Sequence, residues 1–164
     1  MPDHLDPRIG NNFIDANVLD RTGGPEAVAV DVILELHQRE NYDFRLLLTY
    51  SVKAEIAHPH TPAEVKRRAA HMVYSTPVQL IGTELETHDK VRALIQGNSK
   101  PGQHDSDAFH LVESAKYGRH FITNDGRLLK KANEIWGMLH LKVCTPSEWL
   151  AAYKAHARGG AGVA

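Results

Sequence analysis

With 164 residues, 42% of them hydrophobic and 24% charged, the chain has the composition of a globular protein and the length of one domain. Its single cysteine, Cys144, excludes an internal disulfide framework and a cysteine-based zinc site. The 19 basic and 20 acidic residues nearly cancel, which excludes a protein that binds polyanions through bulk charge. Contact with nucleic acid would need local basic groups, such as those at 66–68 and 130–131. No apolar run has the length of a membrane span and no signal-peptide core follows Met1, so we expect a cytoplasmic protein without membrane contact.

The first part of the chain alternates between strand and helix patterns. A short apolar strand is expected at 12–14, and a helix at 25–40 after a Gly-Gly-Pro turn. The continuous apolar run at 45–50 is typical of a buried parallel strand. Ser51 is expected to cap a short helix that ends by residue 57, before Pro59.

The middle of the chain is richer in helix. Helices are predicted over 61–75 and 87–97, with a short strand at 77–82 between them. A further helix begins at Asp105 and is expected to end at Gly118, in the position after a helix that glycine favours.

The last part continues the alternation. A strand at 120–123 leads into the turn Asn-Asp-Gly and a helix over 127–135. A final strand at 139–145 precedes a final helix at 145–157, and a Gly-rich tail follows. Strands that alternate with helices predict an α/β fold in which helices flank a mostly parallel central sheet.

Four carboxylates lie close to the ends of these strands. Asp15 ends the first strand, Glu55 lies on the short helix after the second, and Asp125 follows the strand at 120–123. Asp107 lies in the first turn of the preceding helix, so its side chain leans back toward the same edge. Because sites in such sheets lie outside the carboxyl ends of the strands, we expect all four acids to face one place.

This convergence predicts a metal-dependent chemistry. Four neighbouring carboxylates repel one another and are driven toward protonation, a conflict that a divalent cation removes. Oxygen ligands suit Mg²⁺ or Mn²⁺. Such an ion can activate water and stabilise the charge on a phosphodiester, so the pattern indicates metal-assisted phosphodiester hydrolysis.

Four stretches of the sequence resemble, in order and spacing, the signatures of the PIN-domain nucleases. They are "FIDANVLD", "SVKAEI", "DSDAFHLVESAKYGRHFITND" and "VCTPSEWL". The resemblance covers residues 12 to 150. It implies a single PIN-like, Rossmann-like domain at 12–157, with an N-terminal extension at 1–11 and a flexible tail at 158–164.

The resemblance also implies an activity, that of a Mg²⁺- or Mn²⁺-dependent endoribonuclease that cleaves RNA. The catalytic and metal-binding acids that it implies are Asp15, Glu55, Asp107 and Asp125. The match of Asp107 rests on Ala108 and His110 behind it, and Asp105 remains open as an additional or substitute acid.

Other matching positions have supporting roles. Asn17 and Thr123 match residues that orient the carboxylates through hydrogen bonds, and Asn124 is a further candidate for that role. His110, one helical turn past Asp107, could contact substrate or hold that acid in place.

Small members of this family are mostly the toxins of VapC-type toxin–antitoxin pairs. The resemblance therefore implies a homodimeric toxin, inhibited by an antitoxin protein that covers the acidic pocket, often with a basic side chain. Two features depart from this pattern: Ala16 replaces the Ser or Thr of many members, and the loop 98–103 and the N-terminal extension lengthen the chain. The alternatives are a stand-alone PIN ribonuclease in RNA processing and a PIN-like module that binds RNA or protein without cleavage.

Other classes of protein fit the residues less well. A phosphatase of the haloacid dehalogenase type needs Asp-x-Asp after the first strand, where this chain has Asn17 as the second residue. A nucleotide-binding module needs a Gly-rich loop at that place, and none follows the first strand. Four histidines lack the spacing of a zinc site and are expected at the surface or in the core: His58, His60, His104 and His110.

Overall fold

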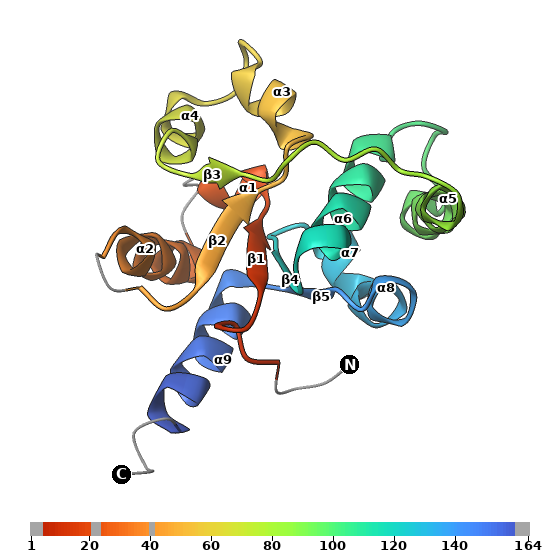
Figure 1. Ribbon diagram of the computed structural model, residues 1–164. Coiled ribbons are helices and arrows are strands. Elements are labelled where there is room, and N and C mark those ends of the chain that lie inside the picture. The colour runs from red at the N-terminus through yellow and green to blue at the C-terminus, as the bar shows by residue number, and fades with distance from the viewer. Residues whose placement is uncertain (1–4, 21–23, 40–41, 160–164) are drawn as a thin grey trace.

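The computed structural model describes residues 5–20, 24–39 and 42–159, and its centre is one five-stranded sheet (Figure 1). The strands are β1 (Asn11–Ile14), β2 (Arg45–Leu48), β3 (Val73–Tyr74), β4 (His120–Ile122) and β5 (Lys142–Cys144). Their order in the sheet is β3-β2-β1-β4-β5, and every pair is parallel. This α/β architecture, with a parallel sheet flanked by helices, is the expected fold class and has the arrangement of a Rossmann-like domain.

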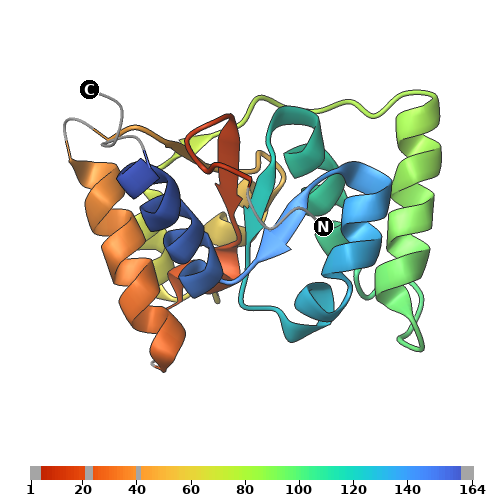
Figure 2. The same ribbon diagram turned by 90° about the horizontal axis from the view of Figure 1, so that it is seen from below.

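Helices cover both faces of the sheet. They are α1 (Ala16–Leu19), α2 (Pro25–Gln38), α3 (Val52–Ala57), α4 (Ala63–Ala69), α5 (Thr83–Gln96), α6 (Asp105–Tyr117), α7 (Gly126–Lys130), α8 (Ala132–Leu139) and α9 (Pro146–Gly159). Helices α2 and α9 lie on one face, and α5, α6 and α8 lie on the other (Figure 2). None of the helices within the described ranges is long and apolar enough to cross a membrane.

The two faces of the sheet form two separate cores. Phe13 and Phe121 pack with α5, α6 and α8, whereas their neighbours Ile14 and Ile122 pack with α2 and α9. Successive side chains of a strand point to opposite faces, so both faces of each central strand must be apolar. This is why the strands appear in the sequence as continuous apolar runs.

The third strand differs from the prediction. The helix expected over 61–75 ends at Ala69, β3 lies at Val73–Tyr74, and no strand is found at 77–82. Val73 and Tyr74 pair with Leu47 and Leu48 of β2. A β-branched and an aromatic residue suit this edge strand, whereas Pro77 has no N–H to donate to a ladder.

Three helix boundaries also differ. The helix expected over 127–135 is divided into α7 and α8 at Lys131, where φ is −105° and ψ is 10°. Helix α5 begins at Thr83, one turn earlier than expected, and α9 continues to Gly159, into the expected tail. The rest of that tail, 160–164, and the first four residues of the N-terminal extension lie outside the described residues.

Gly118 is required by close packing rather than by backbone conformation. Its φ of −149° and ψ of −170° are extended values that any residue adopts. A Cβ at this position would lie 2.6 Å from the carbonyl oxygen of Asn11 and 2.8 Å from the ring of Phe13. The helix ends before Gly118 as expected, and the glycine lets the end of α6 approach β1.

The strand register places two chain segments side by side at the carboxyl edge. Ile14 of β1 pairs with Ile122 of β4. The ladder continues one residue further, because the Asp15 N–H donates to the Ile122 carbonyl at 2.9 Å. Asp15 and Thr123, the residues that follow these strands, are thus neighbours.

Candidate active site

Thr123 connects the two segments. Its side chain is fully buried, and its hydroxyl donates a hydrogen bond to Asp15 Oδ2 at 2.8 Å. The Thr123 hydroxyl oxygen itself accepts from Asn17 Nδ2 at 3.2 Å and from the Asp125 N–H at 3.0 Å. One threonine therefore links the turn after β1 to the turn after β4.

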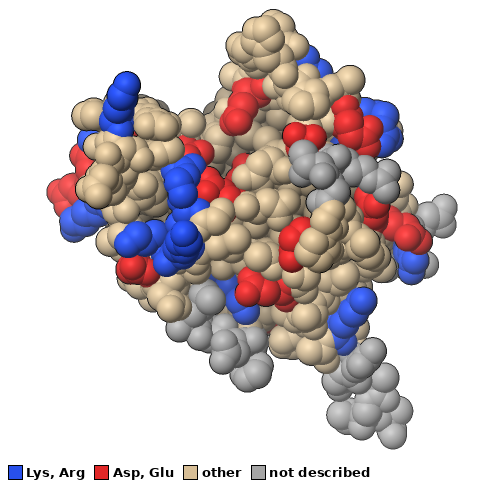
Figure 3. Space-filling view, turned by 180° about the vertical axis from the view of Figure 1, so that it is seen from behind, with Lys and Arg blue, Asp and Glu red and all other residues tan. Residues whose placement is uncertain are grey.

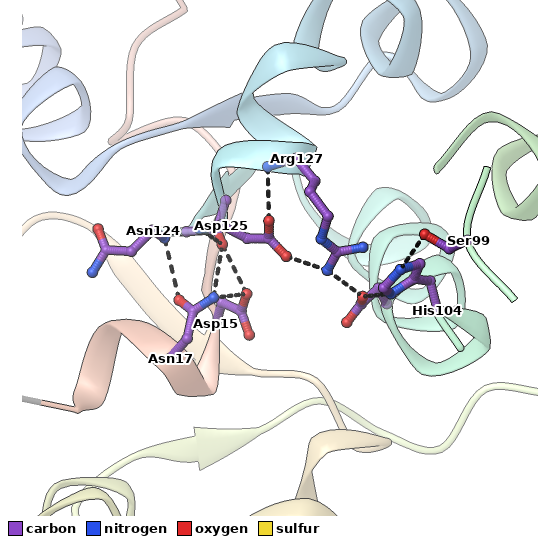
Figure 4. A network of polar contacts seen from close by, with 9 residues as sticks. Asp15, Asn17, Ser99, His104, Asn124, Asp125 and Arg127 are labelled. Carbon is purple, nitrogen blue, oxygen red and sulfur yellow. Dashed lines mark hydrogen bonds and ion pairs between the residues drawn. The ribbon is translucent and has the colours of Figure 1, made fainter. Parts of the chain in front are cut away.

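Asn17 completes this link. Its Nδ2 donates to Asp15 Oδ2 at 2.9 Å, and its Oδ1 accepts from the Asn124 N–H at 3.2 Å. The side chain of Asn124 extends away from the carboxylates in Figure 4, so Asn124 contributes through its main chain. Of the three residues expected to orient the acids, Asn17 and Thr123 contact Asp15 directly.

Asp15 lies in an environment that disfavours its charge. Burial raises the pKa of Asp15, the charges of Asp107 and Glu55 add to this effect and the Thr123 hydrogen bond opposes it, so that the resulting pKa is about 7. The repulsion expected among converging carboxylates is thus present, and a cation at this place would stabilise the charged form of Asp15.

Arg127 bridges two of the other acids. Asp125 caps α7, because its Oδ1 accepts the Arg127 N–H at 2.8 Å. The Arg127 guanidinium donates from one nitrogen, Nη2, to Asp125 Oδ2 and to Asp107 Oδ2, the latter at 3.0 Å. On its other side, Asp107 Oδ2 lies 3.3 Å from His104 Nδ1, and His104 Nε2 lies 3.2 Å from the Ser99 hydroxyl. Asp107 and Asp125 therefore share one positive charge (Figure 4).

The remaining predicted site residues occupy different places. Glu55 is exposed on α3, and its charge acts on both Asp15 and His110. His110 is only 5% exposed, and burial lowers its pKa, against the opposing effect of the charges of Glu55, Asp107 and Glu113. Asp105 Oδ2 faces Gly102 of the preceding loop, 3.8 Å from where a Cβ would lie. Asp107 is the acid of this pair that contacts Arg127.

The four carboxylates, which we call the acidic cluster, have a composition that suits a divalent ion. They are Asp15, Glu55, Asp107 and Asp125. Within the described ranges, no three His, Cys, Asp or Glu side chains already converge as a metal site. Two observations nevertheless fit a cation: the raised pKa of Asp15 and the guanidinium held between Asp107 and Asp125. Carboxylate oxygens are the ligands that Mg²⁺ and Mn²⁺ prefer.

A groove of about 400 Å³ opens beside the acidic cluster. Its apolar lining includes Ile56 and Val65, and the exposed rings of His58 and His60 lie 5.2 Å apart along it. Glu55 belongs to both the groove and the acidic cluster. An extended chain that lies in the groove would therefore pass next to Glu55 and Asn17.

Two basic side chains of α4 are engaged by nearby acids. Arg67 and Arg68 both pair with Glu64, at 2.7 and 2.9 Å, and Arg68 is also buried against Asp31 at 3.0 Å. Over the face drawn in Figure 3, acidic and basic groups lie interspersed. Two of the three basic residues at 66–68, which the sequence indicated as a nucleic-acid contact, are thus engaged in ion pairs.

Two important residues were not identified from the sequence. Arg127 follows Asp125 by two residues, a spacing at which the backbone N–H and the side chain can both reach the carboxylate, and this is the signal that could have revealed it. Glu113 gives no such signal, because its partners are remote in sequence.

Glu113 holds together three elements behind the site. It is 1% exposed on α6, and its carboxylate accepts the N–H groups of Tyr50 and Ser51 at 2.8 and 3.2 Å. It also accepts the hydroxyls of Ser75, at 3.1 Å, and of Ser51. Ser51 does not cap α3 as expected, because its hydroxyl is directed to Glu113. The turn that leads to Glu55 is thereby fixed.

Comparison of the chain with protein-family models, with curated proteins and with solved structures finds no match in any of the three. The function is therefore inferred from the geometry of the acidic cluster and from the resemblance of the four stretches.

Proposed function

We propose that the chain is a Mg²⁺- or Mn²⁺-dependent endoribonuclease of the PIN type. The observation that carries this proposal is the pair of hydrogen bonds at the Thr123 hydroxyl, which joins the Asp15 carboxylate, at 2.8 Å, to the Asp125 N–H, at 3.0 Å. The charges of Asp107 and Glu55 also help burial to raise the pKa of Asp15. Carboxylates from distant segments thus act on one another at the carboxyl edge of a parallel sheet, where such folds bind their ligands. Their mutual repulsion is the condition that a divalent ion relieves.

Each residue has a role that follows from its contacts. The acidic cluster would hold the ion, which supplies an activated water and stabilises charge on the RNA phosphate. Thr123 and Asn17 keep the Asp15 carboxylate in one orientation through its Oδ2. The Asp125 N–H donates to the same Thr123 hydroxyl, so Asp15 and Asp125 are held in fixed positions relative to each other. The groove along His58 and His60 would guide a single-stranded RNA to the acids.

Within this class we propose the toxin of a type II toxin–antitoxin pair. The support is the order and spacing of the four stretches, which are similar to those of the VapC-type toxins. The partners would be an antitoxin protein and a second copy of the chain.

The test is cleavage of RNA by the purified protein. We expect Mg²⁺ or Mn²⁺ to produce discrete fragments and a chelator to stop the reaction. Asp15→Asn should lower the rate by at least about 100-fold, because it removes a charged ligand. Asp89→Asn, which changes an exposed carboxylate on α5, is the matched control and should cleave like the wild type. Equal cleavage by both variants, or cleavage that persists in chelator, would contradict the proposal.

One observation favours a second candidate, a PIN-like module that binds RNA or protein without cleavage. The cation between Asp107 and Asp125 is a side chain of the protein itself, Arg127. In a non-catalytic module this ion pair would be permanent. RNA binding without cleavage, unchanged by Mn²⁺ and by Asp15→Asn, would favour this candidate.

A further inference from the structure

Arg127 occupies the position between two acids that a metal ion would need. Its Nη2 lies 3.0 Å from Asp107 Oδ2 and also contacts Asp125 Oδ2. One nitrogen thus bridges carboxylates from two different helix starts, which is the arrangement in which a bridging cation is bound. The bridge is made by a side chain that is 44% exposed and can leave without disturbing a packed core.

The guanidinium and a divalent ion cannot bind these oxygens together. Two cations in contact with the same pair of oxygens would repel each other strongly, and screening by solvent is reduced in a partly buried cluster. An ion that enters must therefore move the guanidinium away, and its apparent affinity is lowered by the strength of the contact that it replaces.

The backbone around Arg127 does not depend on its side chain. The Arg127 N–H to Asp125 Oδ1 bond, at 2.8 Å, caps α7 and is kept by any residue other than proline. Asp107 keeps its contact with His104 at 3.3 Å. The guanidinium can therefore be removed while the acids keep their other partners.

We propose that Arg127 is a built-in counter-ion of the acidic cluster, which a divalent cation must displace from Asp107 and Asp125 before it can bind. This inference rests on the proposed function, since it assumes that the cluster binds such an ion. The Arg127 guanidinium and a divalent ion from solution would then compete for the carboxylates of Asp107 and Asp125. In the metal-free protein, Asp107 and Asp125 thereby share the positive charge of Arg127.

The competition is measured by titrating metal-stripped protein with Mn²⁺ and following free Mn²⁺ by electron paramagnetic resonance. Arg127→Gln should bind Mn²⁺ about tenfold more tightly than the wild type, because the repelling charge is gone. Arg127→Lys, which keeps a charge, should stay within about threefold of the wild type. Arg92→Gln is the matched control: it removes an arginine of equal charge and similar exposure, 43%, from α5. It should leave the affinity unchanged.

A second readout separates competition from damage to the fold. Without metal, Arg127→Gln should unfold at a lower temperature than the wild type, because Asp107 and Asp125 then repel each other. Added Mn²⁺ should raise its unfolding temperature by more than it raises that of the wild type. Unchanged or weaker Mn²⁺ binding by the folded Arg127→Gln protein would overturn the inference while leaving the proposed function intact. Absence of Mn²⁺ binding by every variant would overturn both.

Discussion

The Asp15 carboxylate is held in one orientation, but its surroundings disfavour its charged form. Its orientation is fixed by hydrogen bonds from Thr123 and Asn17, yet burial and the charges of Asp107 and Glu55 raise its pKa to about 7. In an unfolded chain the pKa of an aspartate is about 3.9. Between these two values the folded state binds more protons than the unfolded state, so a rise in pH across this interval lowers stability.

We therefore expect the contribution of Asp15 to lower the free energy of unfolding of the metal-free protein as the pH rises from about 4 to about 7. His120 has the opposite effect, because burial lowers the pKa of its ring to about 4 and its contribution rises with pH. The difference between the pH dependences of the wild type and of Asp15→Asn gives the contribution of Asp15 alone. Near neutral pH the variant should have the higher free energy of unfolding. Urea unfolding in chelator at about pH 5 and about pH 7.5 measures the difference. An identical pH dependence of the two proteins would contradict the prediction.

At the scale of elements, Glu113 joins α6 to the ends of β2 and β3. Four donors converge on its buried carboxylate, from Tyr50, Ser75 and twice from Ser51. A glutamine offers one oxygen acceptor and directs an NH₂ group at the remaining donors. Glu113→Gln should therefore lower the free energy of unfolding by about 2–3 kcal/mol.

Urea unfolding checks this, with Glu86→Gln as the control, because Glu86 is an exposed acid on α5. The control should differ from the wild type by less than about 0.5 kcal/mol. A neutral effect of Glu113→Gln would mean that the three elements are held together by their apolar packing alone.

The approach of α6 to β1 gives a second prediction at this scale. Gly118→Ala places a methyl group 2.6 Å from the Asn11 carbonyl oxygen and should destabilise the protein by about 1–3 kcal/mol. The matched control is Gly137→Ala in α8, where a Cβ meets nothing within 4 Å and where alanine is the better helix former. Thermal unfolding should thus move in opposite directions for the two variants. Similar shifts would show that the close contact at Gly118 is relieved at little cost.

At the scale of the whole molecule, the fold class was predictable because each central strand is apolar on both faces. Phe13 and Ile14 enter different cores, and this local pattern is visible in the sequence. β3 was misplaced because two residues carry little pattern, and its position depends on pairing with β2. Long-range pairing of that kind cannot be inferred from local propensity.

The part of the candidate site that depends on strand direction was likewise predictable from the sequence. The strand-end rule, which depends only on strand direction, predicted that Asp107 and Asp125 lie near each other, and Arg127 contacts both. The contact of Thr123 with Asp15 agrees with the orienting role that the resemblance implied. The role of Arg127 depends on the angle at which α7 leaves β4, which the sequence does not encode locally. The donors around Glu113 lie 38 to 63 residues away in the chain, and only the assembled sheet reveals them.

The order of the strands has a consequence for the growing polypeptide on the ribosome. β1 is made early, but its neighbour β4 comes much later, and the Thr123 to Asp15 hydrogen bond spans 108 positions. A nascent chain that has not yet emerged as far as β4 carries Asp15 without Thr123, Asp125 or Arg127. Asp15 and Asp125 are therefore brought together only after β4 has emerged, at the same stage as Arg127, which pairs with Asp107 and Asp125. A truncated product that ends before β4 would leave the ribosome without an assembled acidic cluster.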